Sequence, residues 1–174
     1  FCGIREVGGG QWTAMSQIVA EVLGIPFERV SVVAGDTEIT PNEGGTGGSL
    51  TTGRVGTTVR LAAEDARSQL LHLAAQRLKV KEEYLVTGLG QIYAKEASET
   101  AISIAELATA ALTSPAGPIL GTGKHLREKW VAALADAKGV VDAAQYCTHA
   151  AYVEVDAETG QVRVLKYFAC HDVG

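Results

Sequence analysis

The stretch VGGGQWTAMSQIVAEVLG, residues 7–24, joins three consecutive glycines to an amphipathic pattern. Its apolar residues recur with the spacing of one helix face, namely Met15, Ile18, Val19, Val22 and Leu23. We therefore expect a helix from Thr13 that ends at Gly24, since a glycine commonly closes a helix. A glycine run is costly to order unless the backbone turns sharply or approaches something closely. We interpret residues 8–10 as a candidate binding loop at a helix N-terminus, although a lone glycine loop is more often a plain tight turn.

The segments around this helix indicate both strands and helices. Residues 2–7 and 29–34 have strand composition, and a second helix is expected over residues 56–78. A second glycine-rich loop, PNEGGTGGSLTTG, occupies residues 41–53 before that helix. The side of the second helix expected to pack against other elements comprises Val59, Ala62, Ala66, Leu70, Leu73 and Ala74.

The second half predicts two hairpins and one further helix. A short hairpin is expected around residues 88–90. A longer one is expected over residues 151–166, because apolar and polar residues alternate on both sides of the turn DAETGQ. Residues 103–112 predict a helix, with Ser103 and Glu106 as a capping box.

These elements together predict an α+β fold with one or two βα-type lobes, mixed sheets and packed helices. A two-lobe division would separate residues 1–80 from residues 81–174. Because the chain stops directly after a strand pattern, we expect it to be a fragment of a longer protein.

Composition and charge restrict the partners. The chain has 174 residues, 47% of them hydrophobic, and a net charge of −5. An acidic balance argues against nucleic-acid and anionic-membrane partners, which require a basic surface. The cysteines, Cys2, Cys147 and Cys170, are interpreted as buried free thiols. The histidines, His72, His125, His149 and His171, lack metal-binding spacing within one helix, so we interpret them as structural or surface residues and predict no metal ligands.

Both glycine loops carry features of a binding site. Each precedes a helix, where unpaired N–H groups and the helix dipole favour an anion. The second loop also offers hydroxyl groups, on Thr46, Ser49, Thr51 and Thr52, but lacks the lysine of a P-loop. A large anionic ligand with many hydrogen-bonding groups would suit both loops. The alternative is a dinucleotide-binding βαβ unit ending at Asp36. The presence of Thr13 in place of the third glycine of that motif argues against it.

The segments GGGQWT, GDT, GGTGGSLTTG and VEVDAETG resemble the molybdenum-cofactor-binding large subunit of the xanthine dehydrogenase and aldehyde oxidase family. The resemblance covers residues 8 to about 73 and 150–174, and it indicates a fragment of the C-terminal part of that subunit. It implies a molybdopterin cofactor held between loops, and oxidative hydroxylation of purines, N-heterocycles or aldehydes. It also implies partners: the rest of the large subunit, and iron–sulfur and flavin (FAD) domains or subunits that carry electrons away. The expected location is the cytoplasm, with the periplasm as the alternative.

The resemblance assigns cofactor-binding positions in both loops. These are Gly8, Gly9, Gly10 and Gln11 in the first loop, and Gly45, Thr46, Gly47, Gly48, Ser49 and Thr51 in the second. The family pattern has glutamine where this chain has Gly9, and arginine where it has Leu50. Gln11 is the candidate substitute for the missing glutamine. We expect the two loops to lie close together at one edge, with backbone N–H groups making most of the cofactor contacts.

No catalytic residue is predicted within this chain. The family segment that carries the general-base glutamate is absent, and we expect Glu6, Glu21 and Glu43 to be solvated surface residues. The isolated chain is therefore predicted to be inactive, although it belongs to an oxidoreductase. Two alternatives remain open: a non-catalytic domain that keeps the fold without a working site, and a dinucleotide-binding module.

Overall fold

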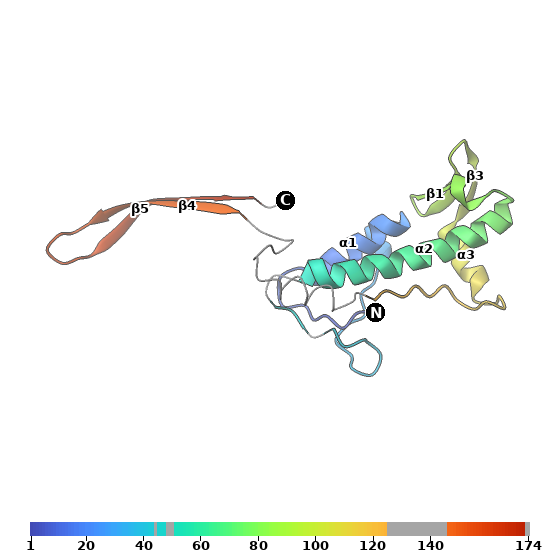
Figure 1. The fold of residues 1–174 in the computed structure, drawn as a ribbon, viewed down its shortest axis with the longest axis horizontal. Coiled ribbons are helices and arrows are strands. Elements are labelled where there is room, and N and C mark those ends of the chain that lie inside the picture. Colours follow the sequence, from blue (N-terminus) through green and yellow to red (C-terminus); the bar gives the residue numbers. More distant parts are fainter. Residues whose placement is uncertain (44, 48–50, 125–145, 173–174) are drawn as a thin grey trace, which may run out of the picture. The chain divides into compact units, whose positions relative to one another are not determined.

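The computed structural model describes residues 1–43, 45–47, 51–124 and 146–172 (Figure 1). Its contacts group the chain into two units, Phe1–His125 and Leu126–Gly174, each of which is described by itself. Residues on both sides of position 80 share one hydrophobic cluster, so the contacts do not separate the chain there. The helices and small antiparallel sheets of the described chain agree with the expected α+β class.

The first helix, α1 (Gln11–Leu23), begins two residues before the expected position. Gly10 precedes it in the left-handed region, with φ 75°, and Gly24 ends it with φ 66°. Met15, Ser16 and Ala20 are buried along its inner face. The periodic pattern and the terminal glycine therefore predicted this helix correctly.

The two strands expected beside α1 reduce to one parallel bridge. Cys2 pairs with Ala34, and the Cys2 N–H donates to the Val33 carbonyl at 3.0 Å. The start of the second expected strand is instead a 3₁₀ turn, η1 (Phe27–Arg29). The prediction of full strands over residues 2–7 and 29–34 is therefore wrong, because an extended segment becomes a strand only where a neighbour completes its ladder.

The second helix follows the second glycine loop. One π-helical turn, η2 (Thr52–Gly56), leads directly into α2 (Thr57–Leu78), close to the expected bounds. Ala63, Leu70 and Ala74 are the buried residues of α2. Within the described residues, no helix is both long and apolar enough to cross a bilayer.

A three-stranded antiparallel sheet packs against α2. Its strands are β1 (Leu85–Gly88), β2 (Gln91–Ala94) and β3 (Ala97–Ser103), in that order, after a short 3₁₀ turn, η3 (Glu82–Tyr84). The hairpin around residues 88–90 is confirmed, and β3 is an addition to the expected elements. The helix α3 (Ile104–Ala111) follows, with Ser103 at its N-cap. The Ser103 side chain makes no capping hydrogen bond, so the predicted capping box is wrong.

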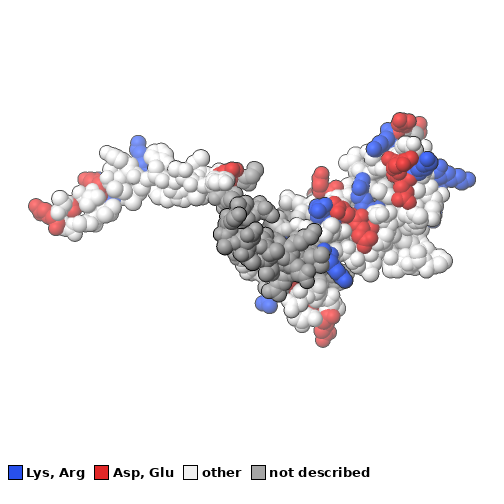
Figure 2. All heavy atoms as spheres, viewed as in Figure 1, with Lys and Arg blue, Asp and Glu red and all other residues white. Residues whose placement is uncertain are grey.

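The core of this unit joins α2, the sheet and α3. Its buried members are Leu70, Ala74, Leu85, Ile92, Ala94 and Leu107. On the face shown in Figure 2, acidic and basic side chains are interspersed over this unit. Among the described residues on that face there is no concentration of positive charge of the kind that binds nucleic acid.

The second unit is an antiparallel hairpin of β4 (Cys147–Val155) and β5 (Val162–His171). Its turn is closed by Asp156, whose Oδ1 accepts hydrogen bonds from the N–H groups of Glu158 and Thr159. The hydrogen bond from Thr159 is the main reason that the pKa of Asp156 is lowered. The hairpin predicted from alternating residues is therefore confirmed and extends further at both ends.

The segment before residue 125 lies directly on α2. Thr122 N–H donates to Asp65 Oδ2 at 2.8 Å. The Gln69 side-chain amide donates to the Leu120 carbonyl and accepts from the Leu120 N–H. A Cβ at Gly121 would overlap the Ala62 carbonyl oxygen, and one at Gly123 would overlap that of Thr58. Glycine is therefore required for this close approach.

Replacing Gly121 with alanine should destabilise the first unit by roughly 1–3 kcal/mol, the usual effect of overpacking. The added methyl group meets helix backbone, which cannot move aside as a side chain does. Thermal unfolding of the chain measures the effect. Gly53→Ala is the matched control, because a Cβ there has nothing within 4 Å. Equal stability of Gly121→Ala and Gly53→Ala would contradict the packing of this segment.

Candidate functional site

The two glycine loops lead into helix starts that touch each other. Met15 of α1 and Val55 of η2 are buried in the same cluster as Cys2 and Ile4. A Cβ at Gly56 would lie 3.0 Å from Ile18 Cδ1 and 3.7 Å from Met15 Cε. The helices that follow the loops are thus in direct contact near their N-terminal ends.

The segment that leads into the first loop is also adjacent to the second loop. A Cβ at Gly3 would overlap the Pro41 carbonyl oxygen, so the chain before the first loop runs against the start of the second loop. Gly48, Ser49 and Leu50 lie outside the described residues. The expected short separation between Gly10 and Gly48 therefore stays a prediction.

The first loop is organised around the carboxylate of Glu6. Its Oε1 accepts the N–H groups of Gly8 at 2.9 Å and Gly10 at 3.0 Å, and its Oε2 accepts that of Trp12 at 3.1 Å. The hydrogen bond from Trp12 is the main cause that lowers the pKa of Glu6. Glu6 is exposed, as expected, but it is not merely solvated: it satisfies three of the N–H groups expected to face a ligand.

Gln11 turns back beneath the first loop. Its side chain is buried, and its Oε1 accepts a long hydrogen bond of 3.5 Å from Val7 N–H. A Cβ at Gly9 would lie 2.9 Å from Gln11 Nε2. The amide of Gln11 therefore stands next to the point where a side chain at position 9 would begin.

The second loop is held by an arginine that follows it in sequence. Arg54 Nη2 donates to the carbonyl oxygens of Glu43 at 3.2 Å and Gly45 at 2.9 Å. Gly45 has φ 82°, and Thr46 and Gly47 are exposed. The loop itself contains no basic residue, yet a guanidinium group contacts its backbone.

Two polar atoms near the second loop are buried without a hydrogen-bond partner among the described residues. They are Thr51 Oγ1 and Glu43 Oε2. Burial raises the pKa of Glu43, so the expectation that this glutamate is solvated is wrong. Burial also raises the pKa of the Cys2 thiol, with the charge of Glu43 adding to the effect. Buried polar groups are normally paired, so these atoms indicate a partner outside the described residues.

The cysteines and histidines divide between the two units. Cys2 is buried, as expected, whereas Cys147 and Cys170 are exposed on the hairpin, so the expectation of burial is wrong for those two. His72 is exposed and donates from Nδ1 to Glu82 at 2.7 Å. His125 lies outside the described residues. His149 and His171 are exposed and hydrogen-bonded to each other across the hairpin, an arrangement that spacing within one helix could not reveal.

The first unit is an α+β domain in which two glycine-rich loops lead into helices that contact each other. A family model described as "Molybdopterin cofactor-binding domain" matches residues 1–174, and the chain belongs to that family. This assignment supports the molybdopterin cofactor expected from the sequence and disfavours the dinucleotide-binding alternative.

Individual relatives agree with the family. The chain is 33% identical over 178 residues to the nicotine 6-hydroxylase large subunit of Paenarthrobacter nicotinovorans, covering 99% of this chain and 20% of that subunit. The solved structure of Cu,Mo-CO dehydrogenase matches with a TM-score of 0.78 and 25% identity, over 97% of this chain and 20% of that one. Quinoline 2-oxidoreductase from Pseudomonas putida 86 matches with a TM-score of 0.76 and 28% identity, over 98% of this chain and 21% of that one. The chain thus spans about a fifth of the length of these relatives.

Replacing Glu6 with glutamine should lower the thermal stability of the first unit at neutral pH. The folded loop binds the ionised carboxylate, which lowers its pKa, so the stabilisation is present above the ordinary value of 4.5 and is lost as the pH falls below it. The difference in Tm between the wild-type chain and Glu6→Gln should therefore shrink below pH 4.5.

Thermal unfolding across a pH series measures this difference. Glu21→Gln is the control, because Glu21 is an exposed glutamate near the C-terminal end of α1, far from the loop that Glu6 organises. A Tm difference for Glu6→Gln that persists unchanged at low pH would show that the ionised carboxylate does not organise the loop.

Proposed function

We propose that this chain supplies two of the loops that hold the molybdopterin cofactor in a molybdenum hydroxylase. The observation that carries the proposal is the buried Thr51 hydroxyl, unpaired within the described chain, at the start of the helix that follows the second loop. That helix start packs against α1, directly after the first loop. The proposed contact residues are those assigned by the resemblance: Gly8, Gly9, Gly10, Gln11, Gly45, Thr46, Gly47, Gly48, Ser49 and Thr51.

The described residues fit a group with phosphate and pterin hydrogen-bonding sites. The hydroxyl groups of the second loop and the start of the helix that follows it suit the phosphate oxygens, whereas the N–H groups of Gly8, Gly10 and Trp12 already donate to Glu6. Thr51 can donate or accept, and the Glu43 carboxylate can accept from N–H donors of a heterocycle. Glu6 and Arg54 hold the loop backbones in place without any ligand. A preformed loop loses less conformational entropy when its ligand binds.

The reaction itself belongs to the complete protein. When bound, the cofactor supplies the redox chemistry of oxidative hydroxylation, in which oxygen from water enters a C–H bond. We propose a purine, N-heterocycle or aldehyde as substrate, supported by relatives named for nicotine and quinoline. This chain binds and orients the cofactor, and the general base is expected outside it.

The proposed partners are the rest of the large subunit together with iron–sulfur and flavin domains or subunits. Relatives named as a large subunit and a large chain support this organisation. The hairpin supports it as well, because Tyr152, Val155, Val164 and Phe168 are exposed on its two strands. An isolated two-stranded hairpin is marginally stable in water, so we propose that the rest of the subunit covers the face that carries Tyr152 and Phe168. A cytoplasmic location is proposed on the family resemblance alone.

Replacing Thr51 with valine in the complete subunit should lower its molybdenum content without lowering its stability. The substitution keeps the shape and removes a buried hydroxyl that has no partner in the described chain. Removing such a group is close to neutral or stabilising for the fold, whereas the cofactor would lose a hydrogen bond worth about 1 kcal/mol. Elemental analysis of the purified enzyme and thermal unfolding of the cofactor-free form measure the two effects separately.

Thr57→Val is the matched control, because the Thr57 hydroxyl already donates to the Gly53 carbonyl at 2.6 Å. It should leave the molybdenum content unchanged. A fall in stability with unchanged molybdenum for Thr51→Val would contradict the cofactor contact. A wild-type subunit that holds no molybdenum would instead favour the non-catalytic alternative.

The chain alone should show no hydroxylase turnover. It carries no assigned general base and only part of the proposed cofactor site. The purified chain is incubated with purines or aldehydes and an artificial electron acceptor, beside a heat-killed sample. Turnover above that background would mean that the chemistry needs less of the protein than we propose.

A further inference from the structure

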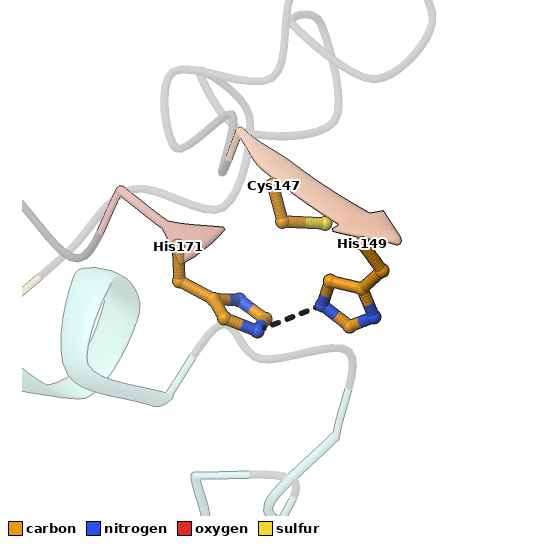
Figure 3. Close-up of side chains that lie close together, drawn as sticks. All are labelled: Cys147, His149 and His171. Carbon is orange, nitrogen blue, oxygen red and sulfur yellow. Dashed lines mark hydrogen bonds between the residues drawn. The ribbon is translucent and has the colours of Figure 1, made fainter. Parts of the chain in front are cut away.

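Three side chains with metal-binding atoms meet on one face of the β4–β5 hairpin. Cys147 and His149 lie two residues apart on β4, so they project from the same face. The strand register places His171 of β5 opposite Cys147. One ligand atom from each of the three lies within 4.8 Å of the other two. Figure 3 shows the three side chains pointing toward one another.

The imidazole of His149 is held from both sides. Its Nδ1 lies 2.8 Å from the Tyr167 hydroxyl, and its Nε2 lies 2.9 Å from Nε2 of His171. Its ring also makes edge-on contacts with both partners, with centroids 5.6 Å and 4.8 Å apart. Two ring nitrogens that face each other so closely need a proton between them, because two lone pairs repel. A metal ion can take the place of that proton.

We propose that Cys147, His149 and His171 bind a transition-metal ion of the zinc class. A thiolate with two imidazoles is a donor set that suits Zn²⁺, whereas Ca²⁺ and Mg²⁺ prefer oxygen ligands. Two nitrogens bound tetrahedrally to zinc lie about 3.3 Å apart, close to the 2.9 Å between the histidines. The three ligand atoms already lie within 4.8 Å of one another, so small side-chain rotations bring them to bonding distance. The fourth position is left to water or another ligand.

Tyr167 is a positioning residue for this site. Metal at Nε2 of His149 requires the proton on Nδ1, and that N–H then donates to the Tyr167 oxygen. Such a partner fixes the tautomer and the orientation of a metal-binding histidine, and its loss typically weakens metal binding roughly 10–100-fold.

The hairpin also provides a matched control. Cys170 is an exposed free cysteine next to His171, but it pairs with Thr148 and projects from the opposite face. A cysteine that binds zinc only because it is exposed would be as effective at position 170 as at 147. If the three side chains form a defined metal site, zinc binding depends on Cys147 and not on Cys170.

The test uses the complete subunit that contains this chain, cleared of zinc with a chelator and titrated with zinc chloride against a competing indicator. Zinc K-edge X-ray absorption then reports the ligands, and this signal is specific to zinc even when molybdenum and iron are present. The expected result is one zinc per chain with one sulfur and two imidazole nitrogens. Cys147→Ser should remove the sulfur signal and weaken binding at least about 100-fold, more than the loss of a supporting residue. Tyr167→Phe should weaken binding roughly 10–100-fold and keep the same ligands.

Cys170→Ser should leave both the affinity and the sulfur signal unchanged. Thermal unfolding of each zinc-free variant shows whether it is folded. A wild-type subunit without bound zinc, or a sulfur signal that disappears in Cys170→Ser and survives in Cys147→Ser, would overturn the proposal. If Cys147→Ser fails to fold, Tyr167→Phe and His149→Gln decide the matter, and unchanged affinity in both would overturn it equally.

Discussion

The contact between α1 and the start of the second helix is the constraint on which the loop region depends. Gly56 lets η2 approach so closely that a methyl group there would press on Ile18. Met15 and Val55 close the same cluster from the two helices. Interiors are packed densely, so two helices joined in this way hold their N-terminal ends in one arrangement. Helix starts that follow loops some forty positions apart in sequence thereby become neighbours.

The backbone of each loop is then held by one charged side chain, an acidic one in the first loop and a basic one in the second. In the first loop, N–H groups converge on the carboxylate of Glu6. In the second, carbonyl oxygens converge on the guanidinium group of Arg54. These three N–H groups and two carbonyl groups of the described loop residues are therefore satisfied from within the chain. Against this background, the unpaired oxygens of Thr51 and Glu43 stand out as positions where the described chain supplies no partner.

Sequence reasoning succeeded where the signal is local. The apolar period of residues 15–23 and the alternation along the final hairpin need no knowledge of distant residues, and α1 and the β4–β5 pair follow from them. It failed at residues 2–7 and 29–34, where the composition predicts two strands but the structure has only one bridge between these segments. It also missed β3, whose sequence ASETAIS is largely polar, because pairing with β2 rather than its own pattern makes it a strand.

The site shows the same division. The glycine loops and their hydroxyl groups were visible in the sequence, but the role of Glu6 was not, since it depends on how the loop curls back on itself. The cluster of Cys147, His149 and His171 depends on the register between two strands, and a one-residue slip would place His171 on the other face. Spacing along the chain carries no information of that kind.

Gly9 and Gln11 show how a departure from the family pattern is tied to its candidate substitute. The Gln11 Nε2 atom lies 2.9 Å from the point where a Cβ at position 9 would stand, so a side chain there would push the flexible end of Gln11 aside. Gln11 is also the first residue of α1, and its backbone is therefore set by the helix rather than by the loop. An amide is retained beside the loop, but it now reaches that place from the helix. A glutamine restored at position 9 would therefore displace the end of the Gln11 side chain, so a change at one position alters the place of the amide at the other.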